Sequence, residues 1–76
     1  MPVQVPYIGR RLKNRRMRAG LTQQELADRA DTTQTTVARI ERDAVEPEVT
    51  TIRKLAKALS AAGLHTTPAD LIPEED

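Results

Sequence analysis

Apolar residues recur every three or four positions along most of this chain. That spacing places them on one face of an α-helix. A first helix is expected to begin near Pro6 or Tyr7 and to end at Ala19. Gly20 comes next and suits a helix end, because glycine adopts the left-handed conformation without strain.

Two short helices follow, separated by a tight turn at residues 31–33. The first of them opens with Thr22 and Glu25, which have the spacing of a capping box, and is expected to end near Ala30. The second is expected from Gln34 to Glu41 or Arg42, with Thr33 as its N-cap. Its large apolar residues are Val37 and Ile40. So narrow an apolar stripe indicates that most of this helix faces outward.

The last third of the chain predicts two more helices. The longer one runs from about Val49 or Thr51 to Ala62, and Gly63 ends it. A short one covers residues 68–72, because Thr67-Pro68 reads as an N-cap followed by proline in the first helical position. The pattern therefore predicts an all-α, compact five-helix domain.

The 76 residues allow one small domain, which we divide into an N-terminal arm (1–6), a helical domain (7–72) and an acidic C-terminal tail (73–76). Trp and Phe are absent, and Tyr7 is the one aromatic residue. The core must therefore consist of Leu, Ile, Val, Ala and Met, and Met17 is expected to lie in it.

Several classes of function are disfavoured. The chain has no cysteine and a single histidine, His65, so neither a thiolate site nor a multi-histidine metal site can form, and no cofactor is expected. The titratable residues do not cluster, which argues against an enzyme. No apolar run approaches the roughly 20 residues of a membrane span, and no secretory signal is visible. We therefore expect no membrane association and a cytoplasmic location.

Charge is unevenly distributed along the chain. Residues 1–42 contain nine Lys/Arg and four Asp/Glu, a net charge of +5, whereas residues 43–76 contain three and seven, a net charge of −4. A basic front half suggests a polyanionic partner, although a solvated helix face that happens to be basic explains the charge equally well.

The second and third predicted helices meet the requirements of a helix-turn-helix. Ala27 supplies the small residue where the two helices cross, and Asp31 tolerates the positive φ that the turn needs. Val37 and Ile40 seat the third helix on the second.

These residues resemble the helix-turn-helix domain of the phage repressor and Cro type, also called the xenobiotic-response-element family. The resemblance covers roughly residues 7–72 and is carried by Arg16, residues 19–27, Val37, Ile40, Glu41, Pro47 and residues 54–59. It implies the five-helix fold of the phage repressors. The family usually has glycine at the positions of Asp31 and Asp43, and aspartate enters the left-handed region less freely.

The resemblance implies that the third helix enters the major groove of double-stranded DNA. The expected base contacts are Gln34, Thr35, Ala38 and Arg39. Glutamine can pair with adenine and arginine with guanine, and the two methyl-bearing residues can touch thymine methyl groups. The expected phosphate contacts are Gln23, Thr33, Thr36, Arg42, Arg10, Arg11, Thr50 and Thr51. Solvated surface is the alternative for each.

Two further sets of residues are expected to act structurally. In this family the residues matching Arg16 and Glu41 form a partly buried salt bridge between the first and third helices. Leu64, Leu71 and Ile72 are the apolar residues left after the core is filled. They are candidates for a homodimer contact, or they simply seal the core.

The sequence therefore favours a DNA-binding transcriptional regulator, most simply a repressor, that binds a pseudo-palindromic operator as a homodimer. One alternative on the same fold is an antitoxin with a toxin partner, and another is a controller of restriction-modification genes. A protein-interaction module without DNA binding is a further alternative.

Overall fold

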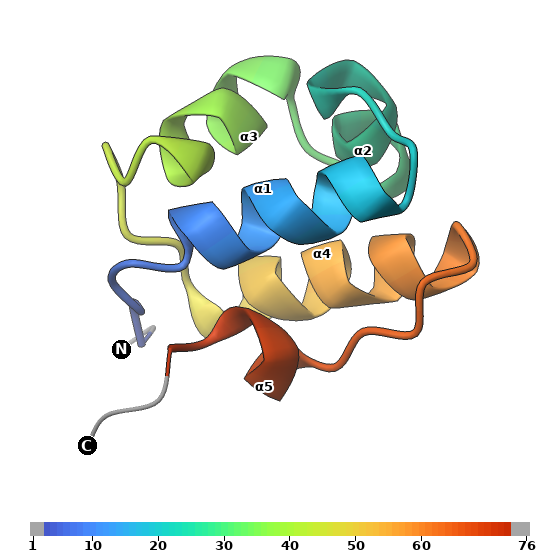
Figure 1. Ribbon diagram of the computed structural model, residues 1–76. Helices are drawn as coiled ribbons and strands as arrows, with labels where there is room; N and C mark the ends of the chain where they lie inside the picture. The colour runs from blue at the N-terminus through green and yellow to red at the C-terminus, as the bar shows by residue number, and fades with distance from the viewer. Residues whose placement is uncertain (1–2, 74–76) are drawn as a thin grey trace.

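The computed structural model describes residues 3–73. Over this range the chain forms five α-helices: α1 (Gly9–Arg18), α2 (Gln23–Arg29), α3 (Gln34–Glu41), α4 (Val49–Ala61) and α5 (Pro68–Leu71). In Figure 1, α1 crosses the middle of the molecule, α2 and α3 lie on one side of it, and α4 and α5 lie on the other. The all-α, five-helix prediction is confirmed.

The expected start of the first helix is wrong by two to three residues. Residues 3–5 run antiparallel to residues 47–49: the Val5 N–H donates to the Pro47 carbonyl and the Val49 N–H to the Val3 carbonyl, both at 2.9 Å. The chain must then turn before it enters α1, and Tyr7 makes that turn with φ +62°. The described part of the N-terminal arm is thus paired with the segment that leads into α4.

α1 begins against the end of α3. A Cβ on Gly9 would lie 2.5 Å from the Ile40 carbonyl oxygen and 2.6 Å from that of Glu41, so only glycine fits there. The Gly9 N–H donates to Asp43 Oδ1 at 3.0 Å, and Ile8 at the N-cap offers no capping side chain. Asp43 therefore caps α1 from across the fold.

The predicted turns and caps of the helix-turn-helix are confirmed. Thr22 and Glu25 form the capping box, because the Glu25 N–H donates to the Thr22 hydroxyl and the Thr22 N–H to the Glu25 carboxylate. The bond from the Thr22 N–H, and after it the Thr22 hydroxyl, lowers the pKa of the Glu25 carboxyl. Asp31 and Asp43, which occupy the positions where the family usually has glycine, both have φ +56°. Gly20 and Gly63 end their helices with positive φ as well.

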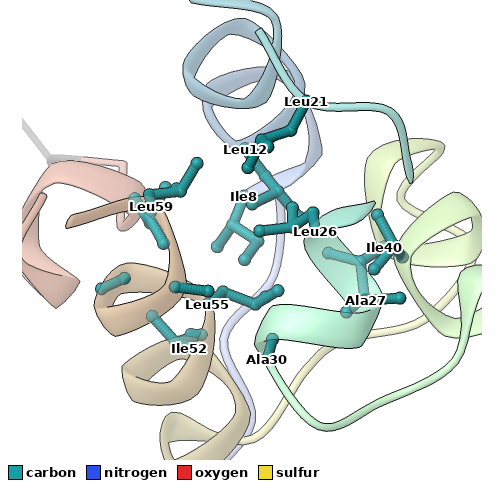
Figure 2. Packing of buried hydrophobic residues seen from close by; sticks show 14 residues of the cluster. Ile8, Leu12, Leu21, Leu26, Ala27, Ala30, Ile40, Ile52, Leu55 and Leu59 are labelled. Carbon is teal, nitrogen blue, oxygen red and sulfur yellow. The ribbon is translucent and has the colours of Figure 1, made fainter. Parts of the chain in front are cut away.

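One hydrophobic cluster fills the space between the helices. Figure 2 shows its side chains converging from α1, α2, α3 and α4. The fully buried large side chains are Ile8, Leu12, Leu26, Val37, Ile40, Ile52, Leu55, Leu59 and Leu71. Met17 is 61% exposed, so its expected place in the core is wrong. Branched aliphatic side chains and alanines fill the core without it.

α5 is held by polar contacts as well as by Leu71. Arg15 Nη1 donates to the His65 carbonyl at 3.2 Å and to the Thr66 hydroxyl at 3.4 Å, and Arg15 Nη2 lies 3.7 Å from Asp70 Oδ1. At the start of α5, the Thr67 N–H donates to the Asp70 carboxylate at 2.8 Å, which lowers the pKa of Asp70. Arg15 thus joins α1 to the α4–α5 connection.

Candidate nucleic-acid interface

α3 presents a polar face to solvent. Gln34, Thr35 and Arg39 are exposed and Ala38 is half-buried, whereas Val37 and Ile40 on the opposite face are buried. Positions four residues apart share a helix face, so the four predicted base-contacting residues lie together. At about 1.5 Å of rise per residue, α3 is about 12 Å long, and an α-helix fits the width of the major groove.

The inner end of α3 is anchored by an ion pair. Arg16 Nε and Glu41 Oε2 lie 2.7 Å apart, and a second bond joins Arg16 Nη2 to Glu41 Oε1 at 3.1 Å. The Glu41 side chain is 3% exposed and that of Arg16 is 13% exposed. Arg16 Nη1 also donates to the Leu21 carbonyl at 2.8 Å, so this arginine ties three segments together. The expected salt bridge is confirmed.

Hydrogen bonds continue from this ion pair to the exposed face of α3. Gln23 Nε2 donates to Glu41 Oε1 at 3.0 Å. Gln34 Nε2 in turn donates to Gln23 Oε1 at 2.7 Å. Gln23 is a predicted phosphate contact and Gln34 a predicted base contact, and the structure places the two side chains in direct contact.

Five of the other predicted phosphate contacts lie near the two ends of α3. At its N-terminus, the hydroxyls of Thr33 and Thr36 are 2.9 Å apart, and the Thr33 hydroxyl also accepts from the Thr36 N–H at 3.2 Å. At its C-terminus, Arg42 is the exposed C-cap residue. The contact between Gly9 and Asp43 brings the exposed Arg10 and Arg11 to this same end.

Thr50 and Thr51 lie in the first turn of α4. Thr50 is exposed and its hydroxyl donates to the Glu48 carboxylate at 3.5 Å, while Thr51 is half-buried. A carboxylate this close opposes a phosphate, so these two threonines are the least suited of the predicted set.

The three candidate residues for a homodimer contact differ in how far they are buried. Leu71 is fully buried, so it seals the core and is unavailable to a second molecule. Leu64 and Ile72 are half-buried, and Ile72 packs against the core cluster. The exposed large apolar residues in the range 3–73 are Val3, Tyr7, Met17 and Val45, none of which was a candidate.

Three contacts were not predicted from the sequence. They are the close approach at Gly9, the Asp43 cap and the bonds that connect Gln34 with Glu41. A glycine early in a helical pattern is the one signal that was present in the sequence. The other two contacts join residues far apart in the chain, and side-chain spacing does not reveal them.

A family model described as "Helix-turn-helix" matches residues 12–60. This chain belongs to the helix-turn-helix family. The match spans α2 and α3 completely, together with most of α1 and α4, so the family covers the exposed face of α3 and its anchoring ion pair.

Two solved structures resemble this helix-turn-helix protein. The restriction-modification controller protein C.AhdI from Aeromonas hydrophila is 31% identical, with a TM-score of 0.77 over 86% of this chain and 87% of that one. The P22 c2 repressor, solved with a synthetic operator, is 24% identical, with a TM-score of 0.74 over 92% of this chain and 96% of that one. The second likeness supports the fold alone. No curated protein sequence matches the chain.

None of the helices in residues 3–73 is long and apolar enough to cross a bilayer. No group of three His, Asp or Glu side chains in the same range is placed to hold a metal ion.

Proposed function

We propose that this protein is a sequence-specific, non-enzymatic regulator of transcription that inserts α3 into the DNA major groove, most simply as a repressor. The observation that carries the proposal is the exposed face of α3, which combines Gln34, Thr35 and Arg39 on a helix fixed from behind by a buried ion pair. Amide and guanidinium groups are the side chains that read base edges. A cytoplasmic location is part of this proposal.

The positions of the arginines support the same placement of α3 in the major groove. Arg39 lies on the outer face of α3, and Arg42, Arg10 and Arg11 lie at its C-terminal end. Arg42, Arg10 and Arg11 would pair with backbone phosphates and so position the helix without selecting a sequence. Affinity should then fall steeply with salt, with a slope of about −0.9 per phosphate contacted.

A homodimer on a pseudo-palindromic operator extends the proposal. One module of this size offers a small interface, and two modules would bind half-sites about 10 base pairs apart or a multiple of that spacing. Leu64 and Ile72 remain the candidate contacts, since Leu71 is buried. Sedimentation of the free protein, compared with that of a Leu64→Glu variant, tests this contact.

Selection from random DNA duplexes tests the function directly, because sequencing the retained DNA gives the site and its symmetry. Arg39→Ala should then weaken binding to the selected site by about 1–3 kcal/mol and relax preference at one base pair. Arg42→Ala is the matched control and should weaken all sequences alike. A protein that enriches no sequence, or an Arg39→Ala variant that behaves like Arg42→Ala, contradicts direct reading by this face.

A second candidate is control of restriction-modification genes. The likeness to C.AhdI favours it, because the alignment covers 87% of that controller protein. A selected site that lies upstream of neighbouring methyltransferase and endonuclease genes would support this role.

A further inference from the structure

The geometry points to a binding site for a small organic dianion in a hollow between the end of α2 and α4. A ligand of this class carries two negative charges, on carboxylate or phosphate groups, and a short aliphatic body. The hollow has a volume of about 290 Å³, at the lower limit of the roughly 300–1,000 Å³ of small-molecule pockets. Its lining comes from the end of α2, the turn that follows and the middle and end of α4.

The apolar part of the lining consists of three alanines, Ala30, Ala58 and Ala61. Ala30 and Ala58 are each 3% exposed. Residues 54, 58 and 61 share one face of α4, because positions three or four apart lie side by side on a helix. A longer side chain at position 58 or 61 would fill the hollow, whereas a methyl group leaves it open. An aliphatic body placed there removes apolar surface from water.

The polar part of the lining is positively charged. Arg29, Lys54 and Lys57 contribute three cations and Asp31 one carboxylate, which leaves an excess of +2. Within residues 3–73, the cations that form ion pairs with Asp or Glu are Arg15 and Arg16, so the three cations of the hollow have no such partner. Guanidinium and ammonium groups both bind carboxylate and phosphate oxygens. A dianion therefore neutralises the hollow.

The hollow lies away from the residues predicted to contact DNA. Gln23 begins α2, whereas Arg29 ends it. Thr51 lies in the first turn of α4, and Ala61 lies about 15 Å further along the helix, at about 1.5 Å per residue. None of the lining residues belongs to α3. A free small molecule therefore suits the hollow better than a DNA phosphate, and the inference does not depend on the proposed function.

NMR titration of the protein, observed at its alanine methyl groups, tests the site with defined probes. The probes are butanedioate, pentanedioate and hexanedioate, with sodium chloride added to keep the ionic strength constant. At least one of them should shift the signals of Ala30, Ala58 and Ala61 saturably, with a Kd of about 1 mM or lower, which is within reach of so few atoms. Inorganic phosphate lacks the aliphatic body and butanediamide lacks the charge, so each should bind at least about tenfold more weakly.

Three variants separate the hollow from the general surface charge. Lys57→Gln removes one exposed cation of the lining and should raise the Kd about tenfold or more, the effect of one lost bond to a charged group. Arg53→Gln is the matched control, because Arg53 is an exposed residue of α4 outside the lining, and the Kd should change less than about twofold. Ala61→Leu fills the hollow without changing the charge and should abolish the shifts of Ala30 and Ala58.

Several results would overturn the inference, and none of them bears on the proposed function. Absence of saturable shifts with all three dicarboxylates excludes this class of ligand. Equal weakening by Arg53→Gln and Lys57→Gln shows attraction to the surface charge in general, and an unchanged Kd in Ala61→Leu places the anion outside the hollow. Inorganic phosphate that binds as tightly as the dicarboxylates shows that the alanines play no part.

A DNA phosphate in the hollow would give a different pattern. Lys57→Gln, and not Arg53→Gln, would then weaken binding of a mixed-sequence DNA duplex, while the free dicarboxylates would cause no shifts. That result would replace the small-molecule site with a further DNA contact.

Discussion

The two ends of α3 differ in how tightly the rest of the protein holds them. Ile40 and Glu41 at the C-terminal end are surrounded by α1: the backbone of Gly9 packs against their carbonyl groups, and Arg16 pairs with the Glu41 carboxylate. Gln34 and Thr35 at the N-terminal end are exposed, and one hydrogen bond to Gln23 restrains Gln34. The comparison shows how a helix of eight residues can be both anchored and displayed.

Contacts at the C-terminal end of α3, its anchored end, should contribute more to the free energy of unfolding than contacts at its N-terminal end, the displayed end. Arg16→Ala leaves the buried Glu41 carboxylate without its cation and should lower the free energy of unfolding by about 3–5 kcal/mol. Arg15→Ala is the matched control, because its ion pair with Asp70 is partly exposed and such pairs contribute about 0–1 kcal/mol. Urea denaturation measures both variants, and equal losses would contradict the distinction.

The packing of α1 on α3 predicts the next largest effect. In Gly9→Ala the added Cβ meets two backbone carbonyl oxygens and the Asp43 carboxylate, so the helices must separate. Overpacking of this kind typically costs about 1–3 kcal/mol. Thermal unfolding tests this expectation, and an unchanged midpoint would show that the close approach at Gly9 is not needed.

The two aspartates with positive φ predict smaller effects of different sign. Asp31→Gly removes the strain of a side chain in the left-handed conformation and should stabilise the protein by up to about 1 kcal/mol. Asp43→Gly gives the same relief but removes the cap on the Gly9 N–H, and losing a cap costs about 1 kcal/mol. Asp43→Gly should therefore be neutral or destabilising. Equal stabilisation by both substitutions would show that the Asp43 side chain does not stabilise the start of α1.

The displayed end should contribute little to stability. Gln34→Ala and Arg39→Ala replace exposed side chains away from the core, so the free energy of unfolding should stay within about 0.5 kcal/mol. Chemical denaturation beside the DNA-binding assay separates the two properties. A stability loss that matches the loss of binding would mean that this end of α3 is also structural.

The smallest expected effect concerns the Thr22–Glu25 capping box, which lies at the start of α2 near the displayed end of α3. It is measured as the free energy of unfolding over a series of pH values. Hydrogen bonds from Thr22 place the pKa of Glu25 below its ordinary value in the folded protein. The carboxylate therefore stabilises the fold fully above its unfolded pKa, and this contribution is lost as the pH falls through the lower, folded value. In Glu25→Gln the acid part of the stability curve should flatten. Parallel curves for the two proteins would contradict this assignment.

Much of the fold could be predicted because its signals are local. The Thr22–Glu25 capping box, the Thr33 cap and the apolar spacing each involve residues within one or two helical turns. The start of α1 could not be predicted this way, because the pairing of residues 3–5 with 47–49 overrides the tolerance of Pro6 for a first helical turn. Met17 was placed wrongly because its spacing does not say whether the core still has room.

The order of the amino acids alone determined the five helices and the polar character of the outer side of α3, because periodicity and end signals act over a few neighbouring positions. Tertiary structure alone decided that Asp43 caps α1, that Leu71 is sealed inside and that Gln34 is linked through Gln23 to a buried ion pair. Each of these contacts joins residues brought together only when the helices pack.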